Sequence, residues 1–186
     1  MIPLTSLWLP ILVSSVFVFM ASAVMHMVLT YHRTDFAKIP GEDQAMESLG
    51  ALNIPPGDYM MPHAESPKAM ESQEYIDKAT KGPVAFMVVS PSGPPRMGGS
   101  LAQWFVYCLI VGLIAGYVAS RALSPSDDYL SVFRFVGVTA FCCYAVGGWP
   151  NSIWYKMKWS STLKSTFDGL VYALLTAGAF GWLWPS

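Results

Sequence analysis

The amino-acid sequence predicts an all-α membrane protein: a bundle of four transmembrane helices with a small α+β cytoplasmic insert between helices 1 and 2. Of its 186 residues, 53% are apolar and only 12% are charged, about half the charged share of a soluble domain. Four apolar runs are long enough to cross the hydrocarbon layer, which takes about 20 helical residues. Residues 31–100 separate the first two runs and contain nine of the twelve acidic side chains.

The first apolar run extends from Leu7 to Thr30 and contains no Asp, Glu, Lys or Arg. A signal peptide is the rival interpretation, because Ala21-Ser22-Ala23 resembles a cleavage site. However, the N-terminus carries no Lys or Arg, and the run is longer than the about 7–15 residues of a signal-peptide core. We therefore expect residues 1–30 to form an uncleaved transmembrane helix.

Residues 31–100 form an extramembrane insert and linker, in which the sequence predicts two helices. The first covers Glu42–Leu52, where two acids at the start complement the helix dipole. The second covers Pro67–Lys81, with Ser66 as its N-terminal cap and Gly82-Pro83 as its stop.

Two short strands complete the predicted insert. Val84–Val89 is apolar and β-branched, and Asp58–Met61 is bracketed by turn residues, so we expect the two segments to pair. A unit of this size has little core of its own, so we expect it to pack on the membrane helices. Ser90–Ser100 is rich in Pro, Gly and Ser and is typical of a linker.

Residues 101–186 contain three further predicted spans, Leu101–Leu123, Tyr129–Trp149 and Thr166–Trp184. The loop Pro150–Ser165 mixes aromatic side chains with lysines, a pattern typical of segments in the headgroup layer. The tryptophans expected to act as interfacial anchors are Trp154, Trp159, Trp182 and Trp184.

The distribution of Lys and Arg predicts the orientation in the membrane. Six basic residues lie near helix ends on the side of the insert: Arg33, Lys38, Arg96, Lys156, Lys158 and Lys164. The other side has Arg121 and Arg134, for which Asp127 and Asp128 are the expected partners. We therefore expect residues 31–100 in the cytoplasm and both termini on the periplasmic side.

Small residues recur at four-residue spacing, which places them on one face of each helix. The strips are Cys108, Gly112, Gly116 and Ser120 in the second span, Thr139, Cys143 and Gly147 in the third, and Gly169, Ala173, Ala177 and Gly181 in the fourth. Such strips let helices approach closely, either within one bundle or between copies in a homo-oligomer. Packing within one bundle is favoured, because four short spans must first pack on each other.

His26 and Asp168 are a candidate polar pair inside the membrane. Ser22, His26 and Thr30 are spaced by four and are predicted to share a face, and Asp168 lies at a similar depth. A His–Asp pair could relay protons or bind a cation, since imidazole titrates near neutral pH. The alternatives are a hydrogen bond between helices and a local pair of Asp168 with Lys164, one turn earlier.

Other chemistry is weakly indicated. Met25-His26-Met27 invites a Cu(I) interpretation, but adjacent helical side chains diverge and packing explains the triplet better. His32 and His63 lack a ligand-spaced partner and are expected at the surface. We therefore expect no metal and no cofactor, and the low net charge of −1 argues against nucleic-acid binding.

Several motifs carry a resemblance to a group of proteins. Pro150-Asn151-Ser152-Ile153-Trp154, Trp159, Asp168-Gly169 and the turn Tyr31-His32-Arg33 are similar to those of small four-span bacterial inner-membrane proteins of uncharacterised function. This resemblance covers about half the chain. It implies a bacterial inner membrane and a four-helix bundle, and it implies no catalytic residues.

The sequence contains no recognisable catalytic signature, such as a phosphate-binding loop or a nucleophile elbow. We expect a non-enzymatic accessory subunit that binds a membrane-protein partner through the insert. The alternative is a small oligomeric transporter or channel that uses His26 and Asp168. A transporter needs a continuous polar path, whereas the middle of each span is apolar or small, which favours the first prediction.

Overall fold

The computed structural model describes residues 2–185, which separate into two compact units. The first, called the membrane unit below, consists of the chain up to Phe36 and from Arg96 onward. The second, called the insert, is Ala37–Pro95.

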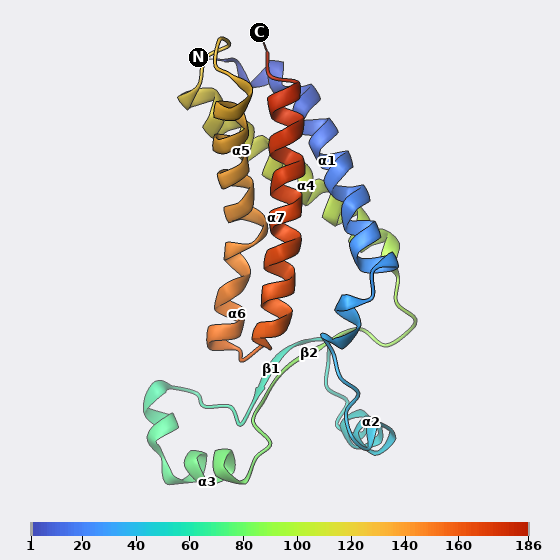
Figure 1. Ribbon diagram of the computed structural model, residues 1–186. Helices are drawn as coiled ribbons and strands as arrows, with labels where there is room; N and C mark the ends of the chain where they lie inside the picture. Colours follow the sequence, from blue (N-terminus) through green and yellow to red (C-terminus); the bar gives the residue numbers. More distant parts are fainter. Residues whose placement is uncertain (1, 186) are drawn as a thin grey trace. The chain divides into compact units, whose positions relative to one another are not determined.

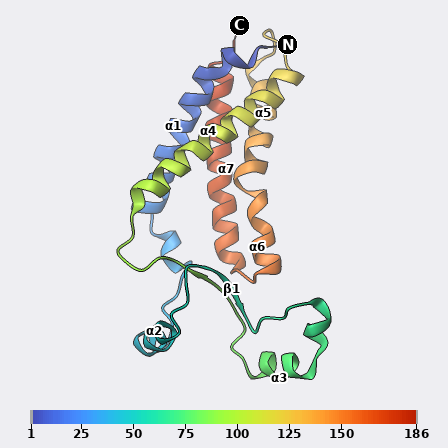
Figure 2. The same cartoon turned by 180° about the vertical axis from the view of Figure 1, so that it is seen from behind.

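The membrane unit is a bundle of helices. α1 (Trp8–Ala23) follows a 3-10 turn at Leu4–Leu7 and continues into a π turn at Val24–Val28. The other long helices are α4 (Met97–Ala122), α5 (Tyr129–Tyr144) and α7 (Trp159–Trp182). A 3-10 turn joins α5 to the short helix α6 (Trp149–Trp154). α7 lies beside both α1 and α5 (Figure 1), and α4 crosses the bundle obliquely (Figure 2). Both ends of the chain lie at one end of this bundle, opposite the α6–α7 connection.

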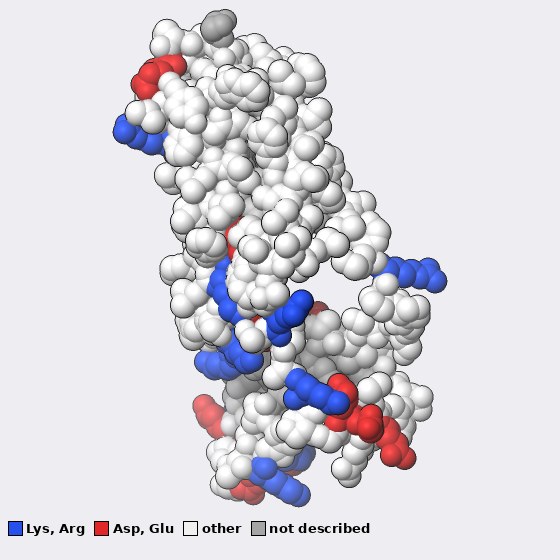
Figure 3. Space-filling view, turned by 45° about the vertical axis from the view of Figure 1, so that its right-hand side comes forward, with Lys and Arg blue, Asp and Glu red and all other residues white. Residues whose placement is uncertain are grey.

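Three helical stretches among the described residues are long and apolar enough to cross a membrane: Leu4–Val28, Met97–Ala122 and Tyr129–Trp154. Their outer faces expose large apolar side chains, and in the view of Figure 3 much of the bundle surface carries no charged residue. These features fit a membrane protein, in which lipid covers such faces.

α7, the predicted fourth span, does not meet the same criterion of apolarity. It has 24 residues, which is sufficient length, but it includes Lys164, Asp168 and many Ser, Thr and Gly residues. Its buried residues outnumber those of every other helix: Thr162, Asp168, Gly169, Tyr172, Ala173, Thr176, Ala177, Ala179 and Phe180. Its modest hydropathy thus follows from its position, since much of its surface touches protein.

Several helix boundaries differ from the predicted ones. The first helical stretch ends at Val28, so Thr30 lies outside it, and α4 starts at Met97 within the predicted linker. The predicted loop Pro150–Ser165 is wrong in extent, because α6 and the first two turns of α7 occupy most of it. Only residues 155–158 connect those two helices.

The small-residue strip of α4 lies against other helices of the same chain. Gly112 and Gly116 are buried, as are Cys108 and Ser120 at either end of the strip. A Cβ atom added at Gly112 would lie 3.4 Å from the side chain of Ile11 in α1.

The strip of α7 approaches α5 more closely still. Added Cβ atoms at Gly169 and Gly181 would lie 2.8 Å from Ala145 Cβ and 2.6 Å from the Tyr129 ring, so a larger residue at either position requires its neighbour to shift. Ala173 and Ala177, between these glycines, are also buried.

α5 does not follow the prediction. Its predicted strip of Thr139, Cys143 and Gly147 is partly or fully exposed, and the buried face is instead Val132, Val136 and Ala140. Other large apolar side chains of this helix, Leu130, Phe135 and Val138, are exposed.

The insert contains α2 (Glu42–Ala51), α3 (Gln73–Lys81), and an antiparallel pair of strands, β1 (Gly57–Met61) and β2 (Ala85–Val89). The predicted strand pairing is confirmed, with Asp58 opposite Val88. The prediction of one helix over Pro67–Lys81 is wrong, because Ser72 adopts an extended conformation that divides it into a 3-10 turn and α3. The Ser72 hydroxyl caps α3 by accepting a hydrogen bond from the Tyr75 amide at 3.3 Å.

The insert has no buried residue anywhere between Ala37 and Pro95, all of which are described. Large apolar side chains are instead open on its surface, among them Val88 (77% exposed), Met46 (69%) and Leu52 (68%). A unit without buried side chains lacks a hydrophobic core of its own.

Candidate functional site

The candidate site forms where the chain leaves the first helical stretch. The Leu29 amide donates to the Val24 carbonyl, which closes the π turn at 3.1 Å. The chain then makes a 3-10 turn at Tyr31–Thr34, and side chains of this segment contact the first half of α7. Single π turns within helices often occur at functional sites.

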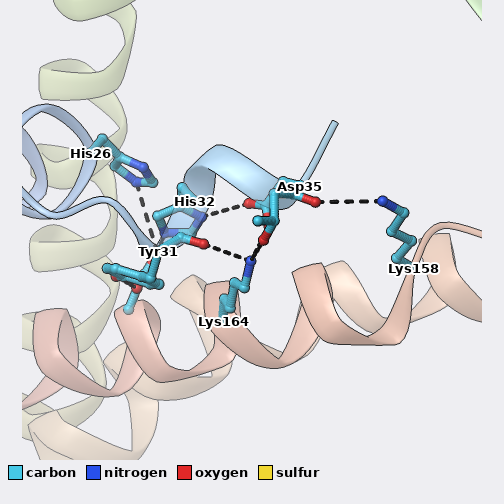
Figure 4. A network of polar contacts seen from close by, with 8 residues as sticks. His26, Tyr31, His32, Asp35, Lys158 and Lys164 are labelled. Atoms are coloured by element: carbon cyan, nitrogen blue, oxygen red, sulfur yellow. Dashed lines mark hydrogen bonds and ion pairs between the residues drawn. The ribbon is translucent and has the colours of Figure 1, made fainter. Parts of the chain in front are cut away.

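Asp168 is the centre of the site. It is 3% exposed and lies in α7, one residue before the close approach of Gly169 to α5. The Tyr31 hydroxyl donates a hydrogen bond to Asp168 Oδ1. Two imidazole nitrogens approach Asp168 Oδ2, His32 Nε2 at 2.7 Å and His26 Nε2 at 3.8 Å. Figure 4 shows these two histidines together with Tyr31, Asp35 and Lys164.

His32 lies between two carboxylates. Its Nε2 contacts Asp168, and its Nδ1 lies 2.6 Å from Asp35 Oδ2. A neutral imidazole has only one N–H group. The contacts of His32 with Asp168 and with Asp35 can therefore both be hydrogen bonds only if the ring or one carboxylate carries an additional proton. Alternatively, a cation can take the place of the proton in one of the two contacts.

Lys164 links α7 to the turn at Tyr31–Thr34 through hydrogen bonds. Its ammonium group donates to the Tyr31 carbonyl at 2.7 Å, to the Thr34 hydroxyl at 2.8 Å and to Asp35 Oδ1 at 2.7 Å. These bonds use all three of its donors. The alternative of a local pair between Lys164 and Asp168 is not found among the described contacts, since the ammonium group contacts the turn instead.

The electrostatics of the turn follow from these contacts. Two hydrogen bonds lower the pKa of Asp35 to about 2, and the one from Lys164 has a larger effect than the one from His32. Burial is the main cause that raises the pKa of the Tyr31 hydroxyl, and the hydrogen bond to Asp168 raises it further. Asp35 is therefore a carboxylate and Tyr31 a protonated hydrogen-bond donor at neutral pH.

The structure brings His26 and Asp168 together, but not through the helix face that the spacing predicts. The π turn and the end of the helix separate Ser22, His26 and Thr30. Ser22 instead accepts a hydrogen bond from Trp104 Nε1 at 2.8 Å. The neighbouring methionines diverge as expected, since Met25 is buried whereas Met27 is 73% exposed.

The prediction that His32 is a surface residue is wrong. Its side chain is only 14% exposed and is held by Asp35 and Asp168. The available signal was the spacing of His32 and Asp35, which are one 3-10 turn apart. Sequence reasoning did not place this turn against α7. The prediction for His63, by contrast, agrees with its exposed position in the insert.

The opposite end of the bundle also differs from the prediction. Asp128 caps α5 through the Leu130 and Ser131 amides, and Asp127 accepts from the Ser124 amide at 2.6 Å. The described contacts include no ion pair between Arg134 and either acid, so the predicted pairing is not found.

The predicted interfacial tryptophans divide into two groups. Trp154 and Trp182 are each 72% exposed and Trp159 is 49% exposed. Trp184 instead packs against the bundle, where its Nε1 donates to the Ser124 carbonyl at 3.1 Å.

Comparisons with protein-family models, with curated proteins and with solved structures give no match to this chain. Functional reasoning therefore rests on the chemistry of the sites themselves.

Proposed function

We propose that the chain is a four-span integral membrane protein that acts as a non-enzymatic subunit and binds a protein partner through its insert. Three helical stretches meet the criteria for spans, and α7 packs along two of them, α1 and α5. A helix enclosed in this way needs less apolar surface than one facing lipid. α7 is thus the fourth span.

The orientation follows from the six-to-two excess of Lys and Arg on the side of residues 31–100 and 150–165. Residues 31–100 are then cytoplasmic and both termini periplasmic, and the motif resemblance implies a bacterial inner membrane. Single cysteines at Ser72 and Ser126, in a cysteine-free background, should react with membrane-impermeant reagents from opposite sides. Labelling of position 72 from the periplasmic side would reverse the orientation.

One observation carries the partner-binding proposal: the insert has no buried residue while it exposes large apolar side chains. Exposed apolar surface of this kind is typical of sites that another molecule covers. A protein partner would supply the core that the insert lacks.

The interior of the membrane unit supports this proposal over a transporter or channel. Its core clusters are apolar, and the buried hydroxyls of Ser14, Ser15 and Thr176 donate to carbonyls of their own helices. Among the described residues of the bundle, Asp168 is the only buried Asp, Glu, His, Lys or Arg, and it lies in the first half of α7. These features leave no continuous polar path through the bundle.

Photo-crosslinking tests the proposal. A benzophenone amino acid at Val88, in the insert, should crosslink the full-length protein to a discrete protein in the native membrane. The matched position is Val138 in α5, which is 65% exposed and should crosslink to lipid. Crosslinks from Val88 only to phospholipid, or only within the same chain, would overturn the proposal in favour of a membrane-lying or self-packed insert.

A further inference from the structure

We propose that His26, His32 and Asp168 bind one divalent transition-metal ion at the end of the bundle. Each residue offers one ligand atom, and the three atoms lie within 4.8 Å of one another. They come from three different elements, the π turn, the 3-10 turn and α7. Distant parts of the chain thus converge on one point.

The distances fit a first coordination shell. Metal–nitrogen and metal–oxygen bonds of about 2.0–2.2 Å place neighbouring ligand atoms about 3–3.5 Å apart. His32 Nε2 and His26 Nε2 lie 2.7 Å and 3.8 Å from Asp168 Oδ2, on either side of that range. Small side-chain rotations bring both nitrogens to bonding distance of an ion between them.

The surrounding contacts orient the ligands. Histidine ligands commonly donate their second ring N–H to a carboxylate, which fixes the tautomer and the direction of the metal-binding nitrogen. Asp35 provides that acceptor for Nδ1 of His32, so Nε2 faces the ion. The Tyr31 hydroxyl holds Asp168 Oδ1, which leaves Oδ2 directed at both imidazoles. Lys164 in turn fixes Asp35.

The charges of the site also favour a cation. Of the two acids of the site, Asp35 forms an ion pair with Lys164, whereas the described ion pairs of Asp168 are with His26 and His32 and include no lysine. A metal ion that replaces the proton between His32 and Asp168 resolves the hydrogen-bonding conflict at His32. A single N–H, at Nδ1, then serves Asp35.

The ligand types select the class of ion. Two imidazoles with one carboxylate suit Zn²⁺, Fe²⁺, Co²⁺ or Mn²⁺. All-oxygen sites suit Mg²⁺ and Ca²⁺, and thioethers suit Cu⁺. Three protein ligands leave at least one coordination position for water or an exchangeable ligand. The His26 side chain is 51% exposed, so that position is accessible from outside the bundle.

Cobalt titration of the full-length protein in mild detergent tests the site. One equivalent of Co²⁺ should bind and give the visible absorption of a nitrogen–oxygen ligand set, and Zn²⁺ should displace it. His26→Gln should weaken Co²⁺ binding at least tenfold. Because the His26 side chain is half exposed and lies 3.8 Å from Asp168, beyond hydrogen-bonding distance, this variant should keep its fold. The matched control is His63→Gln in the insert, which should bind Co²⁺ like the parent protein.

X-ray absorption at the cobalt edge provides a second readout, which reports the ligands of the ion rather than its affinity. Two imidazole ligands per ion are expected, and one should disappear in His26→Gln. Asp168→Asn is a further variant for binding if it folds. Absence of Co²⁺ binding by the folded parent protein would overturn the proposal, as would equal affinities of the His26→Gln and His63→Gln variants.

Discussion

Gly169→Ala should destabilise the bundle, although alanine is the better helix former. The added methyl would lie 2.8 Å from Ala145 Cβ and 3.2 Å from the Ala145 backbone, whereas carbon atoms normally pack at about 3.5–4.0 Å. Because the backbone at Ala145, directly after α5, cannot rotate away as a side chain can, this segment and α7 must separate by several tenths of an ångström. Overpacking of this kind costs about 1–3 kcal/mol. The gain in helix propensity returns about 1 kcal/mol.

Gly178→Ala is the matched control, since it makes the same change within the same helix. Its methyl would meet nothing closer than the Tyr129 hydroxyl, at 3.8 Å. The propensity gain then acts alone, so this variant should be more stable by up to about 1 kcal/mol. The two variants should thus differ by about 1–3 kcal/mol, which is the overpacking contribution itself.

Reversible unfolding of the purified protein, followed by circular dichroism during titration with denaturing detergent, measures this difference. The unfolding midpoint of Gly178→Ala should lie above the parent value and that of Gly169→Ala below it. At the smallest expected overpacking cost, the midpoint of Gly169→Ala should equal the parent value. Equal stabilisation by both would show that α5 and α7 are not in close contact at Gly169, and the packing argument would be refuted.

Three further predictions concern other contacts. Lys164→Met and Asp35→Asn should be non-additive in unfolding free energy by more than about 0.5 kcal/mol. The pKa of Asp35 is about 2 in the folded state, below its ordinary value, so Asp35 stabilises the fold above about pH 4 and loses that effect as pH falls towards 2. If the non-additivity of the two substitutions is unchanged at low pH, the ion pair is contradicted. Gly116→Ile should lower stability by about 1–3 kcal/mol in the same titration, and unchanged stability would place this strip towards lipid. Ser22→Ala should cost about 0.6–1.7 kcal/mol and shift the fluorescence of Trp104 in a variant with no other tryptophan; an unshifted spectrum would argue against that hydrogen bond.

Periodic features of the sequence could be predicted because they depend on spacing within one helix. The strips through Gly116 and Gly169 are examples, since any close approach of helices selects small residues every fourth position. Local turn chemistry likewise predicted the pairing of β1 with β2. The division at Ser72 was missed, although serine is a common N-terminal cap, because a helix could also continue through it.

The candidate site was only half visible in the sequence. His26 and Asp168 stand out as ionisable groups within apolar runs, so their proximity could be proposed. His32 and Asp35 lie in a connecting turn, where no periodicity indicates direction, and their roles depend on how that turn meets α7. The π turn at Val24–Val28 also alters the direction of every side chain after it, which spacing arguments cannot anticipate.

The modest hydropathy of α7 has a consequence for how the protein is made. The translocon releases a segment into the bilayer according to its apolarity, and Asp or Lys at a helix centre opposes release by about 2.5–3.5 kcal/mol. In the four-span topology proposed above, α7 is synthesised after α1, α4 and α5, and it emerges when those helices are already in the lipid. It enters as their partner, with Asp168 meeting Tyr31 and His32 on arrival. On that topology the insertion of α7 depends on contacts with the first helical stretch and the turn after it, so removal of α1 should send α7 across the membrane rather than into it.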